Sequence, residues 1–252
     1  MNQTIKQLLN RKSVRNFTGE SVKEEDLKLI FEAAQRCPTS INGQQISLVY
    51  TRDKEKIAQI AKLCRDQKQV ETADVFVTFV IDFNRTANAI ESLGKEQVVE
   101  KSAEGIIVGA VDAGIMLSSL QTAAESLGYG TTAIGAVRCA PDEFIEILNL
   151  PPKTYPVVGS TIGVAKQHVI EAPLKPRVPL DSFVFEDKYD EVKVKDGVEQ
   201  YEKDLEKFRD DNNMDYLTSH KEAIASFYEN YYMPQVKSSF EKQGFFFEDE
   251  AK

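Results

Sequence analysis

The sequence of 252 residues contains no tryptophan, two histidines and three cysteines, and each scarcity excludes a class of site. Cys37, Cys64 and Cys139 are too few and too scattered for a disulfide framework or a zinc cluster. An odd number of cysteines without paired spacing is typical of a reducing cytosol. His168 and His220 lie too far apart in the sequence for an ordinary metal site, so we expect no bound metal.

Motifs of nucleophilic and metal catalysis are also missing. The chain has no Gly-x-Ser-x-Gly elbow, no His-Glu-x-x-His pair and no Walker phosphate-binding loop. A free cysteine is ordinarily a small buried hydrophobe, which makes Cys37 a weak candidate nucleophile although a polar loop follows it. If the chain is an enzyme, its reactive atoms therefore belong to a cofactor.

Positive charge is in deficit, because 31 lysines and arginines stand against 40 aspartates and glutamates. Nucleic acid and anionic membranes are held by dense positive charge, so we expect neither as a partner. Residues 1–12 lack the apolar run of a signal peptide, and the apolar stretches 73–83 and 106–120 are too short or too interrupted by aspartates for a membrane span. With 42% hydrophobic residues available for a core, we expect a cytoplasmic protein.

Apolar spacing predicts five helices, four strands and one polar loop in the first two thirds of the chain. The expected loop is Cys37–Gln45, and 75–81 is the best candidate for a central strand because it is β-branched and aromatic. This order predicts an α+β fold in which helices cover a mixed sheet. The predicted helices are 4–10, 24–35, 53–64, 104–127 and 142–148, and the predicted strands are 46–50, 75–81, 131–137 and 156–164.

The character of the chain changes after Lys166. Three prolines punctuate residues 173–179, residues 186–215 are dense in charge, and residues 216–242 show helical spacing. The spacing alone fits two interpretations equally well: an arm that wraps another subunit, or a poorly packed end of the chain.

Two cationic segments stand out in this acidic chain. Arg11, Lys12 and Arg15 lie within five residues around Ser13, and a second pair flanks Pro176. A phosphate monoester is recognised by guanidinium forks, an ammonium and a hydroxyl, so the two segments could converge on one phosphate. The alternative is that they are ordinary solvated charges.

A glycine-containing turn and several amide side chains are weaker indications that the chain binds a ligand with a flat ring. The Ile134-Gly135-Ala136 turn could let a ring approach the backbone closely, although a tightly packed strand end would also require a glycine. The amides of Asn42, Gln44, Gln45 and Gln67 could read the polar edge of a heterocycle.

Taken in order, these segments resemble the FMN-dependent nitroreductase family, in particular the branch of the major oxygen-insensitive nitroreductase and the NADPH-flavin oxidoreductases. The resemblance runs from about residue 4 to residue 179 and continues weakly into the tail. It rests on the ordered set Arg11–Phe17, Pro38–Gln44, Asp66–Lys68, Gly128–Gly135 and Lys175–Pro179.

The resemblance implies a nitroreductase-like α+β fold with a mixed, mainly antiparallel sheet and helices around a long central dimer helix. It further implies an FMN-binding core over residues 1–180. Residues 181–252 would form a C-terminal extension of the same domain unit that packs on the partner subunit of a homodimer. On that view the tail is the arm, and each FMN lies at the subunit interface.

The resemblance also assigns roles to single residues. Arg11 and Ser13 would bind the FMN phosphate, and Lys175 and Arg177 would complete that clamp. Arg15 would contact the flavin pyrimidine and stabilise negative charge at its N1 and O2 atoms, with Lys68 a weaker candidate. The full set implied for FMN binding is Arg11, Lys12, Ser13, Arg15, Thr39, Gln67, Ala133, Ile134, Gly135, Ala136, Lys175 and Arg177.

The implied activity is transfer of hydride from NADH or NADPH to the flavin N5 and then, in ping-pong turnover, to small acceptors such as nitroaromatics, quinones or free flavin. The alternatives are a protein that binds FMN as a sensor or carrier without turnover, and a helical interaction protein whose cations are solvated. One departure concerns the pyridine nucleotide, because Asp210, Asp211 and Asp215 stand where this branch carries arginines. These acids would repel a 2′-phosphate, so NADH becomes a candidate donor.

Overall fold

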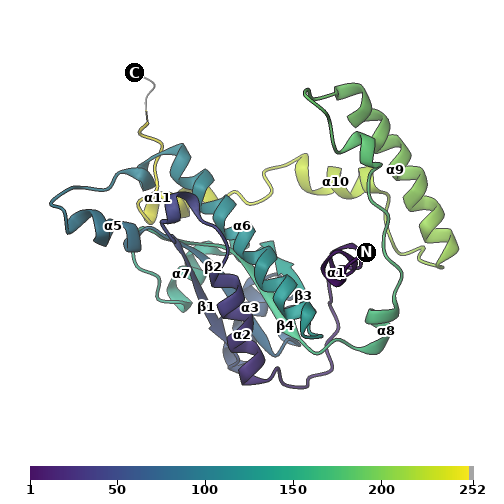
Figure 1. Ribbon diagram of the computed structural model, residues 1–252, viewed down its shortest axis with the longest axis horizontal. Helices are drawn as coiled ribbons and strands as arrows, with labels where there is room; N and C mark the ends of the chain where they lie inside the picture. The colour runs from purple at the N-terminus through teal and green to yellow at the C-terminus, as the bar shows by residue number, and fades with distance from the viewer. Residues whose placement is uncertain (250–252) are drawn as a thin grey trace. The chain divides into compact units, whose positions relative to one another are not determined.

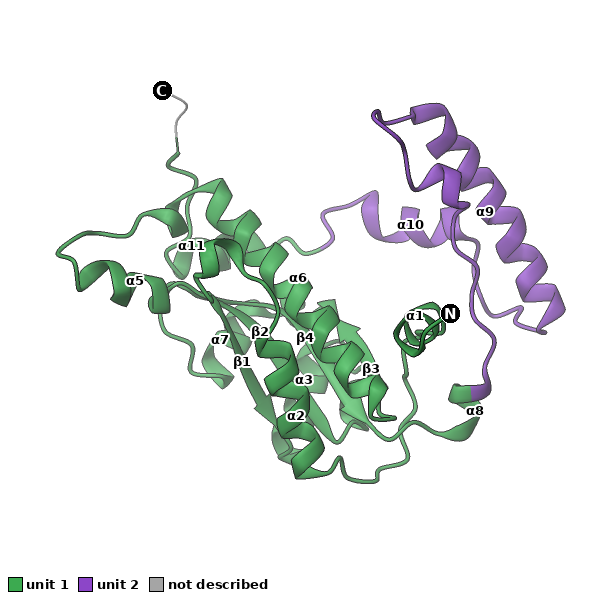
Figure 2. Ribbon diagram, viewed as in Figure 1, with its two compact units in different colours: residues 1–170, 233–252 green, residues 171–232 purple. Residues whose placement is uncertain are grey.

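The computed structural model describes residues 1–249 and divides into two compact units. Of the described residues, the first unit comprises 1–170 and 233–249, and the second comprises 171–232 (Figure 2). The expected extension 181–252 is therefore shared between them, since residues 181–232 belong to the second unit and the following segment returns to the first.

A four-stranded sheet forms the centre of the first unit, in the order β1-β2-β4-β3 (Figure 1). Every pairing among these strands is antiparallel, as expected for a mainly antiparallel sheet. The strands are β1 (Ile46–Thr51), β2 (Val75–Asp82), β3 (Gly130–Ile134) and β4 (Thr154–Gly163). The predicted strand 131–137 is too long, because the chain leaves β3 at Gly135 and forms a 3-10 turn over Gly135–Cys139.

Strand β2 is central and buried on both faces, which explains its nearly continuous apolar sequence. Side chains alternate between the two faces of a strand. Val77 and Phe79 accordingly join one core cluster with α2 (Glu24–Gln35) and α6 (Ala103–Ser126), whereas Phe76 joins another with α3 (Lys54–Leu63) and α7 (Pro141–Ile147). The register with β4 shifts between Phe79 and Val80, opposite Pro156, which has no N–H to donate to the ladder.

The other helices of the first unit are shorter. Pro141 stands at the start of α7, where a missing N–H costs nothing, and α5 has no buried residue. They are α1 (Gln3–Leu9), α4 (Lys68–Glu71), α5 (Asn84–Glu91) and α11 (Val236–Lys242), with α8 (Gln167–Glu171) at the boundary between the units.

Helix α6 is the longest helix and packs against both α2 and the sheet. The Ser102 hydroxyl caps its first turn, and Gly128 follows its end with a φ of +89°. By length and composition α6 is apolar enough to cross a membrane, contrary to the expectation from the shorter stretch 106–120. The core helix of a soluble protein passes the same test, and Asp112 and Gln121 of α6 are buried in hydrogen bonds within the fold.

The second unit contains α9 (Glu191–Asp211) and α10 (His220–Tyr228). Residues 186–215, described from the sequence only as dense in charge, contain the long helix α9. The buried residues of α9 are Gly197 and Leu205. The expected helical segment 216–242 is not continuous, because it splits into α10 and α11 around Pro234. The two parts of that segment belong to different units.

Candidate functional site

The first cationic segment is fastened beside the beginning of β3. The N–H of Val14 donates to the carbonyl of Thr131 at 2.8 Å, and the hydroxyl of Thr132 donates back to the carbonyl of Val14. Gly130 makes this approach possible, because a Cβ there would lie 2.6 Å from Cγ1 of Val14. Gly130 therefore makes room for the cationic segment.

A second fastening follows a few residues later. The N–H of Thr18 donates to the carbonyl of Val164 at 2.9 Å, and Phe17 pairs with Ala165 in an isolated bridge. Phe17 packs over Gly163, where a Cβ would lie 2.7 Å from the ring. Residues 14–18 are thus held against the adjacent ends of β3 and β4, which fixes the backbone that carries the cations.

Arg11 is oriented by the C-terminal part of α6. Its guanidinium donates to Oε1 of Gln121 at 2.8 Å, and its Nε lies 3.9 Å from the Glu125 carboxylate. Burial raises the pKa of Glu125, while the Thr131 hydroxyl and the Arg11 charge act in the opposite direction. A guanidinium carries five N–H donors, so a fixed Arg11 retains donors for a ligand.

The other cations of the segment differ in their surroundings. Nζ of Lys12 donates to the carbonyl of Ile170 at 2.8 Å. Ser13 is half-buried, whereas Arg15 is exposed. The segment therefore joins one oriented guanidinium, a hydroxyl and a solvent-facing cation on a backbone tied to the sheet.

Thr39 lies in a strained loop between α2 and β1. Three residues that are not glycine adopt left-handed φ angles there: Ile41 (48°), Asn42 (56°) and Gln44 (52°). Such a conformation persists only where other contacts over-determine it. The Thr39 hydroxyl oxygen accepts from the Gln44 N–H at 3.1 Å, which leaves the hydroxyl hydrogen to donate elsewhere.

Asp112 of α6 holds this loop. Its carboxylate accepts from the Ser40 N–H at 3.2 and 3.3 Å and from Nε2 of Gln45 at 2.6 Å. Burial raises the pKa of Asp112, and the hydrogen bond from Ser40 counteracts it. Burial and the Asp112 charge also raise the pKa of the Cys37 thiol, which therefore stays protonated and is a poor nucleophile.

The structure does not bring Thr39 and Arg11 of one chain together. Their anchors on α6, Asp112 and Gln121, are nine positions apart, which is about 13 Å along the helix axis and two and a half turns. The two anchors therefore lie on opposite faces of α6.

Gln67 stands at the beginning of α4, half-buried, and its Oε1 accepts from Nε2 of Gln69 at 2.8 Å. The neighbouring Lys68 is exposed, and its ammonium lies 2.8 Å from the Glu71 carboxylate, which raises the pKa of Lys68. The charge of Lys68 is thus already paired with the carboxylate of Glu71.

The end of β3 presents a glycine that the chain itself does not require. Ala133 is exposed and Ile134 is buried, whereas Gly135 is half-buried with Ala136 next to it. A Cβ at Gly135 would meet only Nη2 of Arg138 at 3.5 Å, an ordinary contact, and the φ of Gly135 lies outside the left-handed region. Tight packing therefore does not account for this glycine, and the backbone here is open to close approach.

Lys175 and Arg177 are both exposed and belong to the second unit. Nη1 of Arg177 makes a long contact of 3.5 Å with the neighbouring Pro176 carbonyl. That this pair meets Arg11 on one phosphate stays a prediction.

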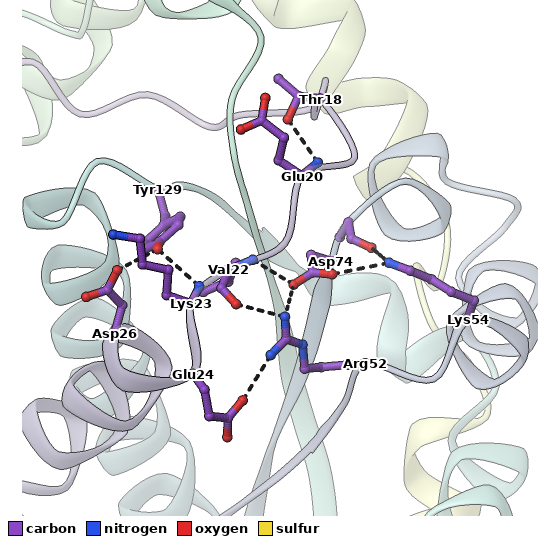
Figure 3. Close-up of polar contacts among 11 residues, drawn as sticks. Thr18, Glu20, Val22, Lys23, Glu24, Asp26, Arg52, Lys54, Asp74 and Tyr129 are labelled. Atoms are coloured by element: carbon purple, nitrogen blue, oxygen red, sulfur yellow. Dashed lines mark hydrogen bonds and ion pairs between the residues drawn. The ribbon is translucent and has the colours of Figure 1, made fainter.

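A separate polar cluster ties the beginning of α2 to β2 (Figure 3). The Asp74 carboxylate accepts from the Val22 N–H at 2.9 Å and from Nη2 of Arg52 at 2.7 Å. Arg52 also pairs with Glu24 at 3.0 Å, and Lys54 lies 3.5 Å from Asp74. These contacts join the segment before α2 to β1 and to the start of β2, so the cluster stabilises the fold.

Sequence reasoning missed Asp112, Gln121 and Glu125 as site residues. All three are acidic or amide residues within the apolar helix α6. In the sequence, Asp112 was interpreted only as a charge that interrupts the apolar stretch 106–120. A polar residue on the buried face of such a helix is itself a signal, because burial requires a partner. No group of three metal-ligating side chains is present within residues 1–249.

The fold and the site define an α+β protein of the nitroreductase-like class. A family model described as Nitroreductase family matches residues 8–164, and one described as Nitroreductase family, C-terminal domain matches residues 175–248. The chain belongs to the nitroreductase family.

Named relatives agree with this placement. The chain is 38% identical to an FMN reductase (NAD(P)H) of Bacillus subtilis over 97% of this chain and 98% of the relative. The solved structure of NfrA2 from B. megaterium is similar with a TM-score of 0.94 and 35% identity, over 99% of this chain and 100% of that one. An NADPH:FMN oxidoreductase from Vibrio harveyi, solved with NAD+, has a TM-score of 0.85 and 28% identity over 96% and 98% of the two chains.

Proposed function

We propose that this chain is an enzyme, an FMN-dependent oxidoreductase that takes hydride from NADH or NADPH and reduces small electron-poor acceptors. It is similar to relatives named FMN reductase (NAD(P)H), NADPH-flavin oxidoreductase and CR(VI) reductase. The observation that carries the proposal is that the cationic segment 11–15 is hydrogen-bonded to the beginning of β3. At the other end of β3, no atom would obstruct a Cβ at Gly135, so the backbone there is open to a ligand. Nitroaromatics, quinones and free flavin are the acceptor classes we propose, with ping-pong turnover in the cytoplasm.

The residues present fit FMN. Arg11, held by Gln121, and Ser13 supply the donors that a phosphate monoester requires, and Lys175 and Arg177 are assigned to complete the clamp. Thr39 and Gln67 supply polar contacts. The backbone of Ala133, Ile134, Gly135 and Ala136 supplies a surface that a flat ring can approach.

Bound FMN supplies the redox chemistry, in which hydride is accepted at N5 and passed to the acceptor. The chain binds and orients the reactants and provides charge. Arg15, exposed beside the anchored Val14, is assigned to stabilise negative charge on the reduced ring. Lys68 is the weaker candidate because Glu71 already pairs with it.

A homodimer with FMN at the subunit interface completes the proposal. Ile107, Val111 and Ile115 form an exposed apolar stripe on α6, and a Cβ at Gly114 would meet no atom within 4 Å. A glycine inside a helix costs about 0.5–1 kcal/mol relative to alanine. A closely packed second α6 accounts for both features, and residues 181–252 would pack on that partner.

The separation of Thr39 from Arg11 supports the same assembly. The two residues are anchored on opposite faces of α6, so one chain alone does not surround a ligand with both. Two chains related by an α6 interface can each contribute one part of the site.

Acidic residues bear on the choice of pyridine nucleotide. Asp210, Asp211 and Asp215 are exposed at and beyond the C-terminal end of α9. The helix dipole is negative at that end and adds to their repulsion of a 2′-phosphate. We therefore propose that NADH serves as a donor at least as well as NADPH.

Anaerobic reduction of the purified holoprotein by NADH and by NADPH tests the proposal. We expect a yellow protein whose flavin absorbance bleaches with NADH. A yellow protein that neither nucleotide bleaches would support the alternative, an FMN-binding sensor or carrier. A protein that stays colourless with added FMN would refute both.

A further inference from the structure

Asp112 is a buried carboxylate whose charge has no cationic partner. Only 3% of the residue is exposed, and none of the ion pairs found within residues 1–249 includes it. An unpaired buried charge is costly, and an apolar side chain would pack the helix at lower cost. The fold-stabilising role of a core helix therefore does not explain why an aspartate stands here.

The hydrogen bonds of Asp112 close a loop. Its carboxylate accepts from the Ser40 N–H near the beginning of the loop and from Nε2 of Gln45 at its end. Inside the loop, the Gly43 N–H donates to the Ser40 carbonyl at 2.8 Å and the Asn42 N–H donates to the Thr39 carbonyl at 3.0 Å. Since three residues of the loop are left-handed, the clamp opposes relaxation of a strained backbone.

We propose that Asp112 is a positioning residue of the flavin site, which clamps both ends of loop 38–45 and thereby fixes the Thr39 hydroxyl for FMN. The inference rests on the proposed function. Asp112 acts through Ser40, the direct neighbour of Thr39, and does not itself touch the cofactor. The Thr39 oxygen is occupied by the Gln44 N–H, so the direction in which its hydrogen can donate depends on the loop.

The chemistry of the clamp provides a sharp test. Asp112→Leu has a similar branched shape and removes both acceptors, so the Ser40 N–H and the Gln45 amide lose their partner. Asp112→Asn removes only the charge. Its oxygen still accepts from the Ser40 N–H, and after rotation of the Gln45 amide its NH2 group can donate to Oε1 of Gln45, which otherwise has no hydrogen-bond partner.

Asp74→Leu is the matched control. Asp74 is also buried, at 5% exposure, and its carboxylate accepts one backbone N–H together with side-chain donors from Arg52 and Lys54 (Figure 3). It ties the Val22 segment instead of loop 38–45. Both leucine variants should lower the unfolding temperature, so stability alone does not distinguish a positioning role from a structural one.

The experiment measures the dissociation constant of FMN by flavin fluorescence, amide exchange over 38–45 in the FMN-free chain, and kcat and KM. For Asp112→Leu we expect faster exchange in the loop and FMN binding weaker by roughly 10- to 100-fold, the cost of misplacing a group by about 1 Å. Asp112→Asn should recover most of that loss. Asp74→Leu should bind FMN like the wild type. Gln45→Met, which removes one donor and keeps the volume, should give a smaller loss in the same direction even if Asp112→Leu does not fold.

Unchanged FMN binding in both Asp112→Leu and Gln45→Met would overturn the inference alone. Equal losses of FMN binding in Asp112→Leu and Asp74→Leu would also overturn it, because Asp112 would then act only through global stability. A wild-type chain that binds no FMN would refute the proposed function and this inference with it.

Discussion

Gly135→Ala separates ligand binding from packing. In the ligand-free chain the new Cβ would meet Nη2 of Arg138 at 3.5 Å and nothing nearer, and the backbone of Gly135 is one that alanine can adopt. We therefore expect no loss of stability and a gain of up to about 1 kcal/mol from the less flexible unfolded chain. If a flat ring packs against this backbone, the methyl group must displace it. Overpacking of this kind costs about 1–3 kcal/mol, which is roughly 5- to 150-fold in the FMN dissociation constant.

The assay is thermal unfolding of the FMN-free chain together with FMN titration by fluorescence quenching. Gly130→Ala is the control, because its Cβ would lie 2.6 Å from Cγ1 of Val14. Carbon atoms prefer about 3.5–4.0 Å, so the cationic segment must move by about 1 Å. That variant should lose both stability and FMN affinity, whereas Gly135→Ala should lose affinity alone.

Two results would refute this reasoning. Wild-type FMN affinity in Gly135→Ala would mean that no ligand lies against the end of β3. Equal destabilisation of both variants would mean that Gly135 is required for packing after all.

Three further predictions follow from other parts of the chain. Gly114→Leu should dissociate the homodimer in sedimentation, because the new side chain stands between two α6 helices; a dimer as tight as wild type would contradict the α6 interface. Arg15→Ala should leave a folded, FMN-loaded protein that is reduced more slowly by NADH in anaerobic stopped flow, and an unchanged rate would remove Arg15 from its assigned role. The hydrogen bond from Lys242 lowers the pKa of Asp142, so its stabilisation is present above the unfolded pKa of about 4 and is lost as pH falls through the lower folded value. The protection of the amides of residues 236–245, measured relative to their intrinsic exchange rates, should therefore fall on acidification, and Asp142→Asn should abolish that pH dependence.

The core elements could be predicted from the sequence because their burial pattern is local. Helix α2 has the predicted bounds, and β2 reads as buried because both of its faces are covered. Helix α6 and its ends were predicted to within one residue, since an alanine-rich segment stops before Gly128. In each of these elements the apolar period and the end signals agree, which is why the tertiary context did not override them.

The misses occur where local pattern and tertiary structure diverge. Helix α9 carries an apolar stripe at helical spacing, formed by Val194, Val198, Tyr201, Leu205 and Phe208, but the many charges between these residues obscured it. Helix α5 has no buried residue. The spacing over 216–242 looked continuous, but Pro234 interrupts it. The bulge at Val157, next to Pro156, depends on strand pairing, which the sequence of one strand does not report.

The residues assigned to the ligand could be proposed from the sequence, whereas the residues that hold them in place could not. Arg11 and Gly135 belong to short motifs that lie in sequence order, so a resemblance to a family could identify them. Gln121 and Asp112 act through contacts 110 and 72 residues away in the sequence, and such pairings are set by the packing of α6. The family match confirms the resemblance to the nitroreductase family, whereas the roles of individual residues stay predictions.

The convergence of two remote cationic segments on one phosphate is tested most directly by comparing FMN with riboflavin, which lacks the phosphate. Arg11→Ala, Arg177→Ala and the double variant are titrated with both ligands. The account predicts that each single variant weakens FMN binding by roughly 10- to 100-fold, the worth of a charge-assisted hydrogen bond, while riboflavin binding stays constant. Equal weakening of FMN and riboflavin in Arg11→Ala, or wild-type FMN affinity in Arg177→Ala, would contradict it.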